Sequence, residues 1–81
     1  IVIDIAMQQD NILIIGALGQ IGTELTTALQ GIYGKGHVIA SDIVEERNLQ
    51  NFNGIYEHLN ILDKERLNTI IKKHKVTPHF P

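Results

Sequence analysis

Short apolar runs alternate with longer amphipathic segments along this 81-residue chain. Residues 11–15, Asn-Ile-Leu-Ile-Ile, are rich in β-branched side chains and stop at a glycine, which is typical of a strand buried on both faces of a parallel sheet. Residues 37–41 predict a second strand that terminates in Asp42, and residues 54–60 predict a weaker third one. The polar residues 45–53 predict a connection between the last two strands.

A helix is predicted between the first two strands, from about Gln20 to Gln30. Its apolar residues recur at the spacing of a single helical stripe. They are Ile21, Leu25, Ala28, Leu29 and Ile32. Glycines at positions 31, 34 and 36 are expected to end this helix.

A second helix is predicted after Asp63, whose side chain can cap it, and runs to about Lys75. Three lysines lie near its negative C-terminal end. Residues 76–81 stand where a fourth strand would follow, but Pro78 and Pro81 lack the N–H donors of a central strand. The sheet is therefore expected to be truncated there. The inward positions of this helix are expected to be Leu67, Ile70 and Ile71.

Together these elements predict an α/β fold, a partial Rossmann-type doubly wound parallel sheet with about three strands and two helices. The hydrophobic fraction of 43% and the charged fraction of 20% are those of an ordinary globular protein. A net charge of −2 offers no basic field for a phosphate backbone, so nucleic acid is not an expected partner. The apolar run at 12–15 is far shorter than the ~20 residues of a membrane helix, so no membrane association is expected.

The chain has no cysteine, so neither a disulfide framework nor a thiolate metal site is possible. This composition fits a reducing compartment, the cytoplasm or the mitochondrial matrix, and does not decide between them. The four histidines show no metal-ligand spacing, so no metal site is expected. They stand at positions 37, 58, 74 and 79.

Three glycines mark the turn from the first strand into the first helix, in the sequence Gly16-Ala-Leu-Gly19-Gln-Ile-Gly22. In a dinucleotide-binding turn the first glycine permits the tight bend, the second lets the backbone approach a pyrophosphate, and the third lets helix and strand pack closely. Taken alone, the triplet also fits an ordinary strand-to-helix turn. A Walker-type phosphate loop is excluded, because Ile21 stands where its second glycine would be and no Gly-Lys-Ser/Thr follows.

Asp42 ends the second strand twenty residues after Gly22. A carboxylate at this place accepts hydrogen bonds from the adenine ribose and repels a 2′-phosphate, whereas Asp42 taken alone also fits a solvated strand end. Ile43 and Val44 follow it, where a basic residue would favour NADP. The glycines and the aspartate together therefore predict a cofactor site, and the cofactor is expected to be NAD.

The runs Ile-Leu-Ile-Ile-Gly-Ala-Leu-Gly-Gln-Ile-Gly-Thr-Glu-Leu and Val-Ile-Ala-Ser-Asp resemble the extended short-chain dehydrogenase/reductase superfamily, and within it the epimerase-like NAD-dependent L-threonine 3-dehydrogenases. The resemblance covers about residues 11–77. It implies that the pyrophosphate is lined by Gly16, Gly19, Gln20, Ile21 and Gly22, that Asp42 binds the adenine ribose, and that Asn60 and Ile61 border the adenine.

Asn60 departs from the family, whose members usually have aspartate there. Its amide oxygen can still accept a hydrogen bond from the adenine amino group, though more weakly than a carboxylate. Asn60 fits a turn residue at the end of a strand equally well.

The family's active-site Ser/Thr and its Tyr-x-x-x-Lys pair lie beyond residue 81. Tyr33 and Tyr56 are the only tyrosines and neither has a lysine four positions later, so no catalytic residue is predicted. The resemblance implies an NAD-binding N-terminal fragment of an oxidoreductase that, at full length, converts L-threonine to 2-amino-3-ketobutyrate. The alternative is a degenerate, non-catalytic Rossmann-like subunit with a structural or interaction role.

The domain organisation expected from these patterns is an N-terminal extension at 1–10, the first half of an NAD(P)-binding Rossmann domain at 11–77, and a truncated tail at 78–81. Ile1 to Ala6 alternates apolar residues about Asp4 and is hypothesised to add a strand at an open sheet edge. The expected partner at that edge is the rest of the domain or another protein, and a homo-oligomer is a further expectation.

Overall fold

The computed structural model describes residues 4–7 and 11–76. Its elements are β1 (Asp4–Met7), β2 (Ile12–Ile15), α1 (Gln20–Tyr33), the 3₁₀ turn η1 (Lys35–His37), β3 (Val38–Asp42), the 3₁₀ turn η2 (Glu46–Asn48), β4 (Ile55–His58) and α2 (Lys64–Lys73). No helix in the described part of the chain has the length and apolar character needed to cross a bilayer.

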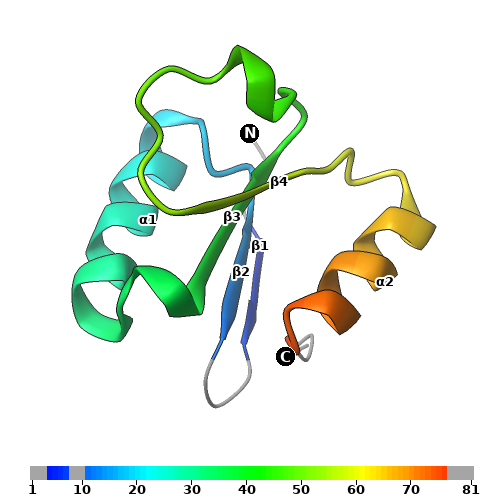
Figure 1. Cartoon of the computed structure of the whole chain (residues 1–81), viewed down its shortest axis with the longest axis horizontal. Coiled ribbons are helices and arrows are strands. Elements are labelled where there is room, and N and C mark those ends of the chain that lie inside the picture. The colour runs from blue at the N-terminus through cyan, green and yellow to red at the C-terminus, as the bar shows by residue number, and fades with distance from the viewer. Residues whose placement is uncertain (1–3, 8–10, 77–81) are drawn as a thin grey trace.

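The strands form one sheet in the order β1-β2-β3-β4. Strands β2, β3 and β4 are parallel, with Ile12 paired to Val38 and Ile39 paired to Ile55. Helices α1 and α2 lie on opposite sides of the sheet (Figure 1). The predicted doubly wound sheet of three parallel strands and two helices is therefore confirmed, and β1 adds a fourth, antiparallel strand.

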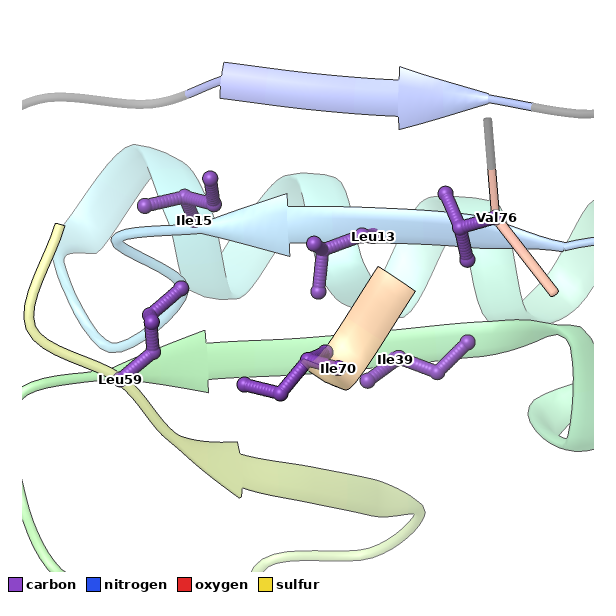
Figure 2. Close-up of a cluster of buried hydrophobic side chains, with 6 residues drawn as sticks. All are labelled: Leu13, Ile15, Ile39, Leu59, Ile70 and Val76. Carbon is purple, nitrogen blue, oxygen red and sulfur yellow. The ribbon is translucent and has the colours of Figure 1, made fainter. Parts of the chain in front are cut away.

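Alternate side chains of the parallel strands enter two separate cores, one on each face of the sheet. Leu13 and Ile15 face α2, whereas Ile12 and Ile14 face α1, and all four are at least 93% buried. Figure 2 shows the core on the α2 face. Its buried members are Leu13, Ile15, Ile39, Leu59, Ile70 and Val76. Burial on both faces explains why residues 12–15 read as a continuous apolar run.

Helix α1 continues past Gly31, so the prediction that this glycine ends the helix was wrong. A single glycine inside a helix costs only about 1 kcal/mol relative to alanine, which the packed helix tolerates. The helix ends instead at Gly34, whose φ of 92° is a conformation that favours glycine and whose N–H donates to the carbonyl oxygen of Gln30.

The predicted apolar stripe of α1 is only partly inward. Leu25 and Leu29 pack on the core, but Ala28 is exposed, and the side chains of Ile21 and Ile32 are 65% and 70% exposed. The cause is Gly22, which packs directly against the backbone of Gly16 and Ala17 in the turn after β2 and fixes the rotation of the helix. At about 100° per residue, Ile21 and Ile32 lie at the flank of the helix, each some 80–100° from the Gly22 direction.

The connection between β3 and β4 contributes to the core on the α1 face. Leu49 and Phe52 pack against that cluster, and the Phe52 ring meets Tyr56 edge to face with centroids 5.5 Å apart. The Tyr56 hydroxyl donates to the carbonyl oxygen of Val44. Burial, reinforced by the negative charges of Asp42 and Glu46, raises the pKa of Tyr56 to about 12. The segment that the sequence predicts as a polar connection is therefore anchored on its apolar residues.

The side chain of Asp63 caps α2, as predicted, by accepting a hydrogen bond from the N–H of Arg66 at 3.0 Å. Ile70 is fully buried, and Leu67 and Ile71 pack against the same core, so the three predicted inward positions are confirmed. The helix ends at Lys73, two residues before the expected end at Lys75.

A charged cluster fastens α2 to β4. The side chain of Glu57, only 9% exposed, accepts from Arg66 at 3.0 Å, from Lys73 at 2.9 Å and from His74 at 2.5 Å. Burial alone would raise the pKa of Glu57, but the hydrogen bonds from His74 and Lys73 outweigh it and hold the pKa below its ordinary value. The cluster spans both ends of α2 and sets its position on the sheet.

The hypothesised N-terminal strand is present as β1, which pairs antiparallel with β2, Asp4 opposite Ile15 and Met7 opposite Ile12. Its first predicted residues, 1–3, lie outside the described residues. So do residues 77–81, on which the expectation of a proline-interrupted tail falls.

Candidate nucleotide site

The glycine turn after β2 is anchored on the end of β3. The N–H groups of Gly16 and Ala17 both donate to the carbonyl oxygen of Ser41, each at 2.9 Å. Gly16 has a φ of 82°, a conformation that favours glycine, so the chain reverses here directly after β2. Ser41 is itself fully buried and donates its hydroxyl to the Ile14 carbonyl at 2.8 Å. The turn is thus held by the neighbouring strand.

Asp42 completes this anchorage through its side chain. One carboxylate oxygen accepts the N–H of Leu18 at 2.9 Å, and the other accepts the N–H of Ile43 at 2.7 Å. The sequence predicts a ribose ligand at this position but not a contact with the glycine turn, because no local pattern reports a bond across 24 residues. The carboxylate is therefore fixed beside the turn.

Helix α1 begins directly after this turn, with Gly19 as its N-cap and a first backbone bond from Thr23 N–H to the Gly19 carbonyl at 2.8 Å. The N–H groups of its first turn have no partner within the helix. No described side chain caps them, and the first turn holds no acidic residue. These amides and the positive end of the helix dipole form a surface suited to an anion.

Gly22 lies against the turn so closely that no side chain fits. A Cβ atom at this position would be 2.4 Å from the carbonyl oxygen of Gly16 and 2.9 Å from the Cα of Ala17. On the same face, the buried hydroxyl of Thr26 donates to the Gly22 carbonyl at 2.7 Å. The third glycine of the motif therefore lets the helix pack closely against the turn that follows β2.

A cavity of about 220 Å³ opens at the carboxyl edge of the parallel strands. It is lined by Ile15, Gly16, Gly19, Asp42, Ile43, Leu59, Asn60 and Ile61. Five of the predicted residues are thus brought together, whereas Gln20, Ile21 and Gly22 lie in the first turn of α1 outside its wall. Ile15, Ile43 and Leu59 were missed as lining residues, although each directly adjoins a predicted one.

Asn60 acts as a turn residue, as its alternative interpretation holds. Its side-chain oxygen accepts the N–H of Leu62 at 3.0 Å, and its carbonyl accepts the N–H of Asp63 at 2.8 Å. Because an amide oxygen carries two lone pairs, this bond leaves one for a ligand. Its place on the cavity wall is compatible with both interpretations.

A larger cavity, of about 500 Å³, lies between α1 and residues 49–53. It contains none of the predicted site residues and touches the glycine turn only through Ala17 and Leu18. Within residues 4–7 and 11–76, no group of three or more His, Asp or Glu side chains is arranged to hold a metal ion.

No protein-family model matches the chain. Among curated proteins it is 43% identical over 65 residues to an uncharacterized epimerase/dehydratase of Staphylococcus saprophyticus and 44% identical over 62 residues to one of Staphylococcus aureus. These alignments cover 79% and 75% of this chain but 20% and 19% of the relatives.

The chain is also similar to solved structures of L-threonine dehydrogenases. The L-threonine dehydrogenase of Clostridium difficile matches with a TM-score of 0.69 and 51% identity, over 79% of this chain and 20% of that one. The GalE-like L-threonine dehydrogenase of Cupriavidus necator matches with a TM-score of 0.70 and 41% identity, over 78% and 20%. The resemblance to the epimerase-like short-chain dehydrogenases is confirmed. The chain spans about one fifth of the length of these dehydrogenases, and the similarity covers only their N-terminal part.

Proposed function

We propose that this chain binds NAD through the adenosine diphosphate half of the cofactor, as the N-terminal part of a short-chain dehydrogenase-like oxidoreductase. The observation that carries the proposal is the position of Asp42. Its carboxylate lies on the wall of the same cavity as Gly16 and Gly19, beside a helix N-terminus with no side-chain cap among the described residues. An anion-binding turn and a ribose-binding carboxylate at one edge are the two halves of such a site.

The residues present fit the ADP half of the cofactor. The free amides at the start of α1, from Gln20 onward, would hold the pyrophosphate. Asp42 accepts two backbone N–H bonds and, because a carboxylate offers about four lone-pair positions, retains acceptors for the ribose hydroxyls. The half-exposed side chains of Ile43 and Ile61 provide apolar contact for the adenine. When bound, NAD supplies the hydride acceptor.

We further propose L-threonine as the substrate of the complete protein, oxidised to 2-amino-3-ketobutyrate, because solved relatives at 51% and 41% identity are L-threonine dehydrogenases. No residue of this chain is assigned to the chemical step, since neither Tyr33 nor Tyr56 has a lysine four positions later. The 81-residue chain is therefore expected to bind NAD weakly and not to oxidise L-threonine.

The proposal is tested by titrating the 81-residue chain with NAD and with NADP, followed by nuclear magnetic resonance because the affinity is expected to be low. NAD is expected to shift the amide signals of residues 16–22 and 42, whereas the 2′-phosphate of NADP is repelled by Asp42 and binds at least about tenfold more weakly. Equal binding of the two cofactors, or shifts confined to the cavity at residues 49–53, would contradict the proposal.

A second candidate function is a structural subunit without cofactor. It is favoured by β1, which pairs with the edge of β2 where a further parallel strand of a cofactor-binding sheet would pair. In this case neither NAD nor NADP shifts any signal of the glycine turn. The same titration therefore separates the two candidates.

A further inference from the structure

The edge of β2 that faces away from β3, here called the outer edge of β2, is covered by β1 along its whole length. The four residues of β1 pair with the four residues of β2, from Asp4 opposite Ile15 to Met7 opposite Ile12. The two strands run in opposite directions, as their arrows show in Figure 2. The carboxyl end of β2, which leads into the glycine turn, therefore lies beside the amino end of β1.

The outer edge of β2 has a defined place in a complete dinucleotide-binding sheet. Such a sheet has the strand order 3-2-1-4-5-6, all parallel. Strands β2, β3 and β4 reproduce its first three strands in position and direction. The fourth strand would pair with the outer edge of β2, the place that β1 takes in this chain. The two strands exclude each other, because one strand edge pairs with one neighbour.

Covering this edge has a physical reason. Residues 12–15 are buried on both faces of the sheet, so an open edge here would expose backbone N–H and C=O groups beside four large apolar side chains. Such an edge promotes pairing with other chains. An antiparallel strand supplied by the same chain satisfies these groups without another chain.

Because β1 takes the place of the fourth strand, it also limits how much of a dinucleotide the chain can contact. A dinucleotide crosses the sheet between its first and fourth strands, where the carboxyl ends of both strands carry the loops that hold its two halves. With β1 in place, Asp4 at the amino end of an antiparallel strand occupies that position beside Ile15. All residues that line the cavity lie between Ile15 and Ile61, and none belongs to β1. The cavity volume of about 220 Å³ is below the ~300–1,000 Å³ of typical sites for drug-sized ligands.

We propose that β1 is a built-in cover for the outer edge of β2, where the fourth strand of a complete sheet would pair, and that while β1 is paired with β2 the chain recognises only the adenosine diphosphate half of a dinucleotide. The second part rests on the proposed nucleotide function. The first part rests on the strand order and register alone. A strand that pairs parallel with the outer edge of β2 must first displace β1.

The ligand part is tested by calorimetric and magnetic-resonance titration of the 81-residue chain with ADP, NAD and nicotinamide mononucleotide. ADP and NAD are expected to bind with dissociation constants within about threefold of each other, and nicotinamide mononucleotide is expected not to bind. An NAD affinity tenfold or more above that of ADP overturns this part. If none of the three binds, the proposed nucleotide function fails together with this part. The covering of the outer edge of β2 is tested separately, by hydrogen exchange.

The strand part is tested by hydrogen exchange on the same chain. The amides of residues 4–7 that face β2 are expected to exchange at least about tenfold more slowly than in an unstructured peptide. Exchange at the unstructured rate overturns the proposal, whatever the nucleotide results.

Proline variants provide the matching comparison. Because alternate amides of an antiparallel strand face its neighbour, either Ile5→Pro or Ala6→Pro must remove a donor to β2. One of the two is expected to speed exchange of the β2 amides that face β1, while β3 and β4 stay protected. Ile5→Val keeps the N–H group and serves as the control. If both prolines leave β2 protection unchanged, β1 does not cover the edge.

Discussion

Gly22 and Gly16 approach each other so closely that a single methyl group on Gly22 would lie 2.4 Å from the Gly16 carbonyl oxygen. The neighbouring atoms are backbone atoms of the turn, which cannot move aside as a side chain can. Gly22→Ala is therefore expected to lower the free energy of unfolding by about 1–3 kcal/mol through overpacking. Urea unfolding followed by circular dichroism measures this change.

The control for that variant is Gly31→Ala, in the same helix. A Cβ atom at Gly31 has no neighbour within 4 Å, so alanine there adds helix propensity without a clash. We expect Gly31→Ala to raise the free energy of unfolding by up to about 1 kcal/mol. If both alanines changed stability equally, the close approach of α1 to the turn would not be the cause.

Asp42→Asn is expected to disturb the glycine turn even without nucleotide. Leu18 and Ile43 donate to different oxygens of the carboxylate, and asparagine replaces one of these oxygens with an NH₂ group, which is a donor and cannot accept the N–H that faces it. Leaving one of these donors without its partner is expected to cost about 1–3 kcal/mol. The amide exchange rate of Leu18 or Ile43 measures the effect in the free chain. Unchanged protection of both amides would show that the carboxylate does not hold the turn.

Glu57→Gln is expected to destabilise the chain near neutral pH by about 1–2 kcal/mol, since the carboxylate receives charge-assisted hydrogen bonds from partly exposed cations. Because the folded-state pKa of Glu57 lies below the ordinary value of 4.5, its contribution is complete above pH 4.5 and is lost as the pH falls through the folded-state pKa. Unfolding curves from pH 3 to 7 should therefore converge for the two proteins at the acid end.

Glu24→Gln is the matched control, because Glu24 is an exposed residue of α1 for which no described ion pair is found. Its effect should stay within about 0.5 kcal/mol at every pH. A constant difference between Glu57→Gln and the parent chain down to pH 3 would mean that the charge of Glu57 contributes nothing.

Tyr56→Phe is expected to alter stability in alkaline solution. The pKa of Tyr56 is raised to about 12 in the folded chain, whereas the ordinary value of 10.0 applies to the unfolded chain. The unfolded state therefore loses this proton first, and the folded state loses stability as the pH rises from 10 to 12. Phenylalanine removes this component, so the decline of stability over that range should be less steep. Parallel declines would show that the phenol titrates equally in both states.

The sequence predicts those parts of the molecule that depend on local pattern. Residues 12–15 are buried on both faces, so their apolar run reports a parallel strand directly, and Asp63 precedes its helix as a cap must. The glycine triplet and Asp42 predict which residues meet at one edge, because the carboxyl ends of adjacent parallel strands lie together.

What the sequence does not predict arises from contacts between distant segments. The rotation of α1 follows from the approach of Gly22 to Gly16, and periodicity alone therefore misplaced Ile21 and Ile32. The bond from Leu18 to Asp42 and the cations around Glu57 join residues whose separation carries no periodic signal.

One carbonyl oxygen, that of Ser41, accepts the N–H groups of both Gly16 and Ala17. The shape of the glycine turn therefore depends on a strand that follows it by more than twenty residues. A peptide ending with the first helix would contain the whole motif and still lack the group that bends it. The smallest unit able to align these amides extends through Asp42, so the turn matures late, after parallel pairing has closed a long stretch of chain. During synthesis, the glycine turn therefore takes this shape only when the second parallel strand has joined the first.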